Sequence, residues 1–268
     1  VSDYVPLEYN QAKKAWASQT DKYESEELGL LKMDFLGLKT LDVITDCARR
    51  VRARHGISIN FDQIQFEDEV FKQVYSKGKT AFVFQFEGAG MQGMLKNFQP
   101  SSFEDLILLV ACYRPGPMQY LEDIIEVKQG RKDMEFLTPQ LKPILSKTYG
   151  AIVYQEQVME IFMQLSGYSY GQADLVRRAM SKKKEEILLN ERTSFLHGDK
   201  KRNIEGCIKR GISEQIANQL FDEMIDFAKY AFNKSHAAAY AKTSYMTAWA
   251  KFHYPTEFMT ASLNIADK

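Results

Sequence analysis

A single carboxylate, Asp34, stands among apolar residues near the start of the sequence, in the run Leu-Lys-Met-Asp-Phe-Leu-Gly over residues 31–37. The apolar residues and the glycines on either side predict a short strand over residues 30–36. An ionised carboxylate between apolar neighbours is costly unless a cation or hydrogen bonds satisfy it, and Mg²⁺ takes such oxygen ligands. The run therefore indicates a metal ligand, although an aspartate at a strand edge or turn is the simpler interpretation of one carboxylate.

Arg114 follows an apolar stretch and stands in the sequence Tyr-Arg-Pro-Gly-Pro over residues 113–117. Because prolines restrict the backbone, the guanidinium extends from a rigid segment and can bind a phosphate through two parallel hydrogen bonds. Pairing of Arg114 with a nearby carboxylate fits these residues equally well.

A run of basic residues lies at 177–184, with Asp174 just before it and two glutamates just after it. On a helix, Arg178 and Lys182 are four residues apart and share a face, while Arg177 lies on another edge. A concentrated basic patch in a chain without excess charge indicates a polyanionic partner. The alternative, ordinarily the commoner one, is a solvated helix surface.

The sequence Phe-Asn-Lys-Ser-His over residues 232–236 precedes a small-residue helix. Ser235 suits the N-cap position, so the free N–H groups and positive dipole end of the helix favour phosphate at this place. Asn233, Lys234 and His236 can add side-chain donors. The alternative is a capped helix that packs its small residues against a neighbour.

Polar-tipped side chains continue along that helix at spacings of four, four and three, at His236, Tyr240, Ser244 and Thr247. Alanines between them let another surface approach closely. The spacing predicts one face directed at a nucleotide, with Tyr240 stacking on a base. The alternative is that the tyrosines form an amphipathic edge of the core.

The elements that must position these residues are mostly helical. Apolar residues at spacings of three and four predict helices over residues 40–55, 66–76, 102–112, 155–166, 170–178, 184–197, 213–230 and 236–254. Residues 80–86 predict a second short strand, whereas residues 1–28 show no strong period. The expected fold class is mainly α with a minor β part.

Composition narrows the class of protein further. The 268 residues carry 35 basic and 35 acidic side chains, and this balance argues mildly against an autonomous nucleic-acid binder. Three widely spaced cysteines form neither a disulfide framework nor a zinc site, which fits a reducing compartment. No signal peptide or long apolar run is present, so we expect a soluble cytoplasmic protein. The start, Val-Ser-Asp-Tyr, predicts a boundary inside a longer polypeptide.

The segments together resemble C-family bacterial replicative DNA polymerases, the family of the DNA polymerase III alpha subunit. The resemblance is collinear from about residue 21. It rests on GLLKMDFLGL (29–38), FVFQFEGAGM (82–91), FEDLILLVACYRPGPM (103–118), TYGAIVYQEQVM (148–159), ADLVRRAMSKK (173–183), FAKYAFNKSHAAAY (227–240) and HYPTEFM (253–259). Ser181 and Ala231 stand where the family usually has glycine, and Ala89 lies at a variable position. None of these departures removes a charged or aromatic candidate.

The resemblance implies that residues 1–40 are the incomplete C-terminal part of a palm domain and that residues 41–268 are a large multi-helix fingers domain, truncated at its end. It implies that Asp34 is the last of three metal-binding aspartates, the other two lying in an earlier motif outside this chain. The basic residues and the Phe-Asn-Lys-Ser-His segment would face the triphosphate. Tyr240 and Ser244 would face the nascent base pair.

The resemblance also implies an activity: template-directed addition of deoxynucleoside triphosphates to primer–template DNA by a two-Mg²⁺ mechanism. The implied partners are DNA, the nucleotide and other replisome subunits, including a sliding clamp, with no membrane. We expect the chain to be inactive in isolation. The alternatives are a non-catalytic helical module that binds nucleic acid or a protein partner, and a purely structural helical domain.

Overall fold

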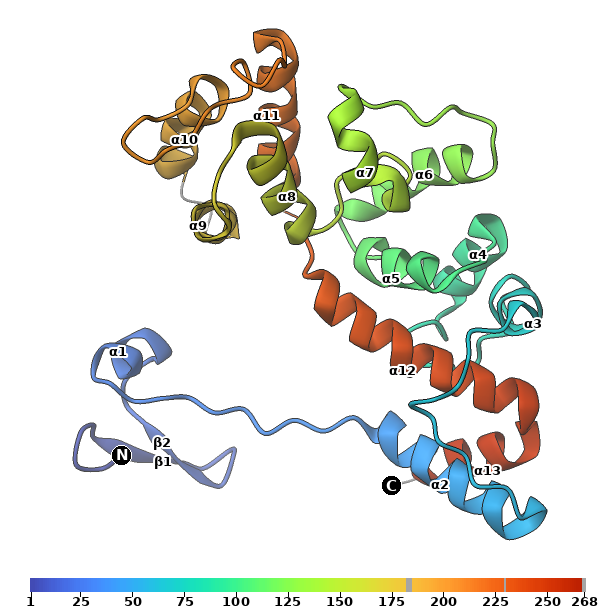
Figure 1. The fold of residues 1–268 in the computed structure, drawn as a ribbon. Helices are drawn as coiled ribbons and strands as arrows, with labels where there is room; N and C mark the ends of the chain where they lie inside the picture. Colours follow the sequence, from blue (N-terminus) through green and yellow to red (C-terminus); the bar gives the residue numbers. More distant parts are fainter. Residues whose placement is uncertain (182–184, 229, 267–268) are drawn as a thin grey trace. The chain divides into compact units, whose positions relative to one another are not determined.

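The structure is a computed structural model that describes residues 1–181, 185–228 and 230–266. It divides into two compact units, Val1–Lys39 and Thr40–Lys268. Helices dominate, and the described strands form one two-stranded sheet (Figure 1). The mainly α fold class is thus confirmed.

The first unit contains elements that the sequence pattern does not predict. Strand β1 (Leu7–Asn10) pairs antiparallel with β2 (Ala15–Ser18), and the rings of Tyr9 and Trp16 meet edge to face at 5.4 Å. Helix α1 (Lys22–Glu27) follows, with Asp21 in a capping box. The hairpin supplies the minor β part.

The strand predicted over residues 30–36 is wrong. Residues 31–38 run extended, and no described residue pairs with them as a strand. Leu31, Phe35 and Leu36 are 78%, 93% and 92% exposed. An alternating apolar run becomes a strand only when a neighbouring strand satisfies its backbone groups, and the described residues supply none.

The second unit begins with α2, close to the predicted bounds. Its elements are α2 (Lys39–His55), α3 (Asp68–Val70), the π-helix η1 (Phe71–Tyr75), α4 (Ala89–Phe98), α5 (Phe103–Cys112), the 3₁₀ turn η2 (Pro117–Tyr120), α6 (Leu121–Lys128), η3 (Pro139–Leu141), α7 (Lys142–Leu145), η4 (Ser146–Thr148), α8 (Gln155–Ser166), α9 (Tyr170–Ser181), α10 (Glu185–His197), α11 (Glu214–Ala228), α12 (Lys234–His253) and α13 (Pro255–Ala266). The predicted helices are confirmed apart from their ends.

Residues 80–86 form turns, so the second predicted strand is also wrong. Val83 and Phe86 are fully buried, and the Thr80 hydroxyl donates to the Phe86 carbonyl at 2.6 Å. Phe82 adopts a positive φ of 61°. The apolar residues therefore anchor a folded-back loop in the core.

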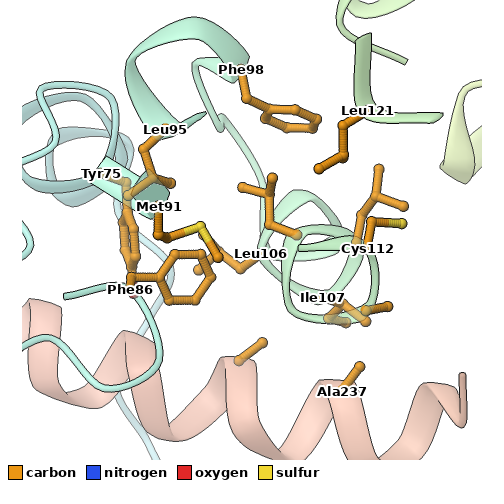
Figure 2. Close-up of a cluster of buried hydrophobic side chains, with 14 of the residues drawn as sticks. Tyr75, Phe86, Met91, Leu95, Phe98, Leu106, Ile107, Cys112, Leu121 and Ala237 are labelled. Atoms are coloured by element: carbon orange, nitrogen blue, oxygen red, sulfur yellow. The ribbon is translucent and has the colours of Figure 1, made fainter. Parts of the chain in front are cut away.

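Three clusters of buried side chains hold the second unit together. The first core lies among η1, α4, α5, α6 and α12, where Tyr75, Phe86, Phe98 and Leu106 are fully buried (Figure 2). Ala237 belongs to this core, and such small residues allow α5 to approach α12 closely. Each large side chain buried in this way contributes about 1.5–3 kcal/mol.

The second core is formed by α7 to α11. The rings of Phe162 and Phe195 lie 4.8 Å apart, and that of Phe221 lies 5.5 Å from Phe195. The third core joins α2 to the end of α12 and to α13, through residues such as Val51 and Phe258. The cysteines at 47, 112 and 207 are free thiols buried in these three cores.

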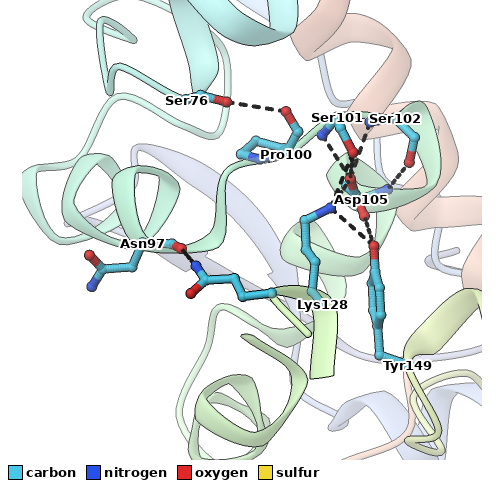
Figure 3. Close-up of polar contacts among 9 residues, drawn as sticks. Ser76, Asn97, Pro100, Ser101, Ser102, Asp105, Lys128 and Tyr149 are labelled. Carbon is cyan, nitrogen blue, oxygen red and sulfur yellow. Dashed lines mark hydrogen bonds and ion pairs between the residues drawn. The ribbon is translucent and has the colours of Figure 1, made fainter. Parts of the chain in front are cut away.

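A buried carboxylate, Asp105, joins α5 to the end of α6. It is 2% exposed and accepts hydrogen bonds from Lys128 Nζ (2.8 Å), the backbone N–H groups of Ser101 and Ser102, and the Tyr149 hydroxyl (Figure 3). Burial alone would raise the pKa of Asp105, but these hydrogen bonds outweigh it and hold the pKa below its ordinary value.

We expect Asp105→Asn to lower the free energy of unfolding by about 3 kcal/mol, because the substitution leaves the nearly buried Lys128 ammonium without its anion. Urea denaturation at pH 7 measures this difference. The matched control is Asp123→Asn, whose carboxylate meets Lys132 at 3.0 Å but is 71% exposed, so it should change stability by less than about 0.5 kcal/mol.

The same pair also predicts a pH dependence. The stabilisation from ionised Asp105 is complete above the unfolded carboxyl pKa of about 4 and is lost as the pH falls through the lower folded pKa. The difference between wild type and Asp105→Asn should therefore narrow as the pH falls below about 4. A difference that stays constant down to pH 2 would contradict this assignment.

Candidate functional site

The segment before α12 pairs with the segment that begins α8. The Phe232 N–H donates to the Val153 carbonyl at 3.2 Å, and the Gln155 N–H donates to the Phe232 carbonyl at 3.0 Å. These two bonds bring residues 153–156 and 231–234, which lie far apart in the sequence, side by side. Most of the predicted site residues gather around this pairing.

Arg114 fixes the backbone of this segment. Its Nε donates to the Ala111 carbonyl at 2.8 Å, one terminal nitrogen donates to the Tyr230 carbonyl, and its guanidinium lies 4.6 Å from the centre of the Phe232 ring. Burial lowers the pKa of Arg114, although an arginine stays protonated at neutral pH. The structure thus commits the guanidinium to carbonyls and a ring, and phosphate binding by Arg114 stays a prediction.

A glycine in the same turn allows the close contact with Tyr230. Gly116 adopts a φ of +99°, and a Cβ at this position would lie 2.6 Å from two atoms of the Tyr230 ring. Any larger residue would both strain the backbone and collide with the ring. The turn formed by the Tyr-Arg-Pro-Gly-Pro sequence therefore packs closely against the residues before α12.

The start of α12 differs from the sequence prediction. The N-cap is Asn233, whose Oδ1 accepts from the His236 N–H at 2.9 Å, and not Ser235, which lies inside the first turn. The Lys234 N–H donates to both carboxylate oxygens of Glu156 at 3.0 Å. Since internal acceptors hold two of the first N–H groups, the remaining phosphate donors here are mainly side chains.

Lys234 extends from this turn across an aromatic ring. Its Nζ lies 3.0 Å from a carboxylate oxygen of Glu104 and 5.3 Å from the centre of the buried Tyr154 ring. The lysine and the glutamate are each about one-third exposed, at 32% and 36%. Both Lys234 and its counterion are therefore within reach of solvent.

Aromatic rings form a row on the same face of α12. The ring of His236 lies 5.5 Å from that of Phe232 and 4.2 Å from that of Tyr240, which in turn lies 5.2 Å from Phe84. His236 is exposed and the other three rings are partly buried. The spacing of four residues thus places His236 and Tyr240 on one face, as the sequence predicts.

The second half of the predicted stripe turns into the core. Ser244 is fully buried and its hydroxyl lies 2.9 Å from that of Tyr75. Thr247 is also fully buried, and its hydroxyl accepts from the Phe84 N–H at 3.1 Å. This part of α12 packs against η1 and the 80–86 loop, so Ser244 faces the protein interior and not the row of rings.

The arginines of α9 share one counterion. Asp174 Oδ1 accepts from Nε and a terminal nitrogen of Arg177 at 2.8 and 2.7 Å, and Oδ2 accepts from Arg178 Nε at 2.7 Å. Arg177 also donates to the side-chain oxygen of Gln155 at 3.0 Å, which ties α9 to the pairing described above. Lys182 lies outside the residues that the structure describes.

Asp34 belongs to the first compact unit, whereas the side chains described above belong to the second. Its carboxylate is 60% exposed and lies 3.2 Å from Lys32 Nζ. Within residues 1–181, 185–228 and 230–266, no group of three or more histidine, cysteine, aspartate or glutamate side chains could hold a metal ion. The metal-binding role of Asp34 stays a prediction.

Comparison with known proteins agrees with the collinear motifs. The family described as the bacterial DNA polymerase III alpha subunit finger domain matches residues 40–203. The chain belongs to this family. Curated relatives named DNA polymerase III subunit alpha are 42% identical in Aquifex aeolicus, 43% in Thermus aquaticus and 41% in Bacillus subtilis. These matches cover 98–99% of the chain but only 21–23% of each relative, so the chain spans just over a fifth of their length.

The resemblance to the alpha subunits is thereby confirmed. In the described residues, no helix of this finger-domain chain is long and apolar enough to cross a membrane. The assignment of residues 1–40 to a palm domain stays a prediction, although the two compact units meet at Lys39 and Thr40.

Sequence reasoning missed the carboxylates that face the candidate cations. Glu156 stands in the Tyr-Gln-Glu-Gln sequence, to which the pattern alone assigns no chemistry, and Glu104 reads as an ordinary helix-start residue. Only Asp174 carries a usable signal, because it precedes Arg177 and Arg178 by three and four residues, the spacing of ion pairs on a helix.

We expect Arg114→Lys to loosen the segment before α12 in the finger domain, since the compact ammonium of a lysine does not reproduce the planar guanidinium that reaches two carbonyls with its edge and stacks on the Phe232 ring with its face. Hydrogen exchange at the Phe232 amide should quicken by about tenfold or more, which corresponds to roughly 1.4 kcal/mol of lost local stability. The control is Arg49→Lys, because Arg49 is 76% exposed on α2 and pairs with Asp46. Unchanged exchange at Phe232 would contradict the assignment.

Proposed function

We propose that this chain is the fingers part of a bacterial replicative DNA polymerase and that it binds the incoming deoxynucleoside triphosphate and the nascent base pair. The observation that carries the proposal is the gathering of cations and stacking rings around one backbone pairing. Arg177 reaches Gln155, Lys234 lies across Tyr154, and the His236–Tyr240 row follows on the next turn.

The cations suit a triphosphate. Arg178 is 65% exposed and Lys234 is 32% exposed, so a polyanion can reach both. Charge on the transferring phosphates is stabilised by such donors when they are held in place before reaction. Gln155, Tyr154 and Glu156 contact Arg177 and Lys234 from the same short segment, which favours a common ligand.

The aromatic row suits a base. Tyr240 has its ring against those of His236 and Phe84, which holds it in place, and every nucleobase offers a face for stacking irrespective of its identity. We therefore propose that Tyr240 and His236 lie beside the nascent base pair. Ser244 is left out of this surface because it is fully buried.

The described residues do not by themselves make a magnesium site, since Asp34 is a lone carboxylate beside a lysine. We propose that Asp34 is one ligand of a two-Mg²⁺ site whose other carboxylates come from outside this chain. The metals would polarise the reacting oxygens. The exposed apolar side chains around Asp34 fit a segment that packs against further structure.

The remaining parts of the proposal follow from the family. The names of the relatives identify a DNA polymerase subunit, so we propose primer–template DNA and other replisome subunits, including a sliding clamp, as partners, in the bacterial cytoplasm. A non-catalytic module that binds nucleic acid is the second candidate, favoured by the exposed Arg178 and the row of aromatic rings, which would serve binding without chemistry.

We expect Asp34→Asn in a full-length alpha subunit that carries this segment to lower primer extension by about 10²- to 10³-fold, because a metal ligand is lost. Steady-state incorporation of a single nucleotide measures this, and circular dichroism should show an unchanged fold. The control is Asp3→Asn, another exposed carboxylate of the first unit. Extension within a factor of two of wild type would remove Asp34 from the metal site.

The isolated chain provides a second test. Because the described residues hold no metal cluster, we expect purified residues 1–268 not to extend a primer at any Mg²⁺ concentration. Gel-resolved extension with the full-length subunit as positive control measures this. Robust Mg²⁺-dependent synthesis by the isolated chain would contradict the proposed division of the metal site.

A further inference from the structure

Asp174 is the counterion of both arginines of α9, Arg177 and Arg178. Its carboxylate accepts side-on from Arg177 and accepts from Arg178 through the other oxygen, with all three distances between 2.7 and 2.8 Å. Such short, charge-assisted bonds are the same ones that a phosphate makes with arginine. The two candidate cations therefore share one carboxylate as their counterion.

This ion pair differs from the buried pair that holds α5 to α6. Asp105 and Lys128 are 2% and 10% exposed, whereas Asp174 is 21% exposed and its partners Arg177 and Arg178 are 26% and 65% exposed. Ion pairs at spacings of three and four on one helix contribute only a few tenths of a kcal/mol when solvent reaches them, as it reaches this partly exposed group. Asp174 is thus a counterion whose loss the fold tolerates, and its arginines can exchange it for another anion.

We propose that Asp174 is an affinity-setting residue of the fingers: its carboxylate competes with the triphosphate for Arg177 and Arg178 and weakens the binding of both the nucleotide and pyrophosphate. This inference rests on the proposed function. The released product of nucleotidyl transfer is itself a polyanion, so a site that bound phosphate without competition would also retain pyrophosphate. A built-in carboxylate keeps the arginines paired before the nucleotide binds and after the product leaves.

The alternative role for Asp174 is to orient the two arginines, and this role predicts the opposite change in the affinity for triphosphate. If Asp174 chiefly positions the guanidinium groups, its replacement loosens them and weakens triphosphate binding. Two features favour competition. First, Gln155 holds Arg177 without help from Asp174. Second, removal of one negative charge about 6 Å from a bound polyanion strengthens the binding of that polyanion by roughly threefold for each of its own negative charges, even in water.

The experiment compares three variants, with Asp174→Ser as a fourth in reserve, in a full-length alpha subunit that carries this segment. Asp174→Asn keeps the size of the side chain and removes its charge. Its KM for deoxynucleoside triphosphate and its inhibition constant for pyrophosphate should both fall by roughly three- to tenfold. Both differences should shrink in 0.5 M salt, because salt screens charge. Asp174→Ser provides the same readout if the amide variant folds poorly.

The matched control is Asp222→Asn, which also removes a carboxylate that pairs with an arginine, in this case Arg192 on the neighbouring helix α10, but which lies among none of the site residues. Its KM should equal that of wild type. Arg178→Gln, the third variant, removes an exposed phosphate donor and should raise KM.

The outcomes separate the two proposals. If Arg178→Gln leaves KM unchanged, the triphosphate does not bind at these arginines and the proposed function of this surface fails. If Arg178→Gln raises KM while Asp174→Asn raises it too or leaves it unchanged, the site stands and the competing role of Asp174 is overturned. The inference is supported if Asp174→Asn lowers KM and tightens inhibition by pyrophosphate while the control Asp222→Asn does neither.

Discussion

The candidate site depends on two backbone hydrogen bonds at one residue, Phe232. They join the segment before α12 to the start of α8. The chain passes between two cores here: Val153 and Phe227 belong to the first core, whereas Val158 and Met224 belong to the second. A single bridge of this kind would be weak alone, since an isolated pair of extended segments is marginal in water. Arg114 strengthens it by donating to the carbonyl of Tyr230, two residues before Phe232, and by stacking on the Phe232 ring.

This arrangement explains why a polar site can be held by short, irregular segments. Glu156 caps α12 from one side of the bridge and Gln155 holds Arg177 from the same side. Because both belong to the first turn of α8, the position of the lysine and the arginine is set by one rigid helix start. The zero net charge of the chain has a local counterpart here: Arg177 and Arg178 share Asp174, and Lys234 faces Glu104, so carboxylates offset much of the positive charge of these three cations.

The helices could be predicted from the sequence because their determinants are local. In α5, Ser102 forms the capping box and the prolines after Arg114 end the apolar run, and in α8 Gly167 ends the helix with a φ of +81°. The strand over residues 30–36 could not be judged in this way, since a strand needs a partner that periodicity does not reveal. The predicted N-cap of α12 is wrong for a smaller reason, since Asn233 and Ser235 both suit the N-cap position. The tertiary contact of the Lys234 N–H with Glu156 favours a helix that starts at Lys234.

The site residues show the same limit more sharply. Residue type and spacing place His236 and Tyr240 on one face, but they cannot say where along α12 that face enters the core. The boundary lies between Tyr240 and Ser244, because from there the helix packs against η1 and the folded-back loop at 80–86, and Thr247 satisfies a backbone N–H of that loop. One continuous stripe of polar-tipped residues thus performs two tasks: its first half faces outward with the cations, and its second half satisfies buried polar groups that keep the first half in place.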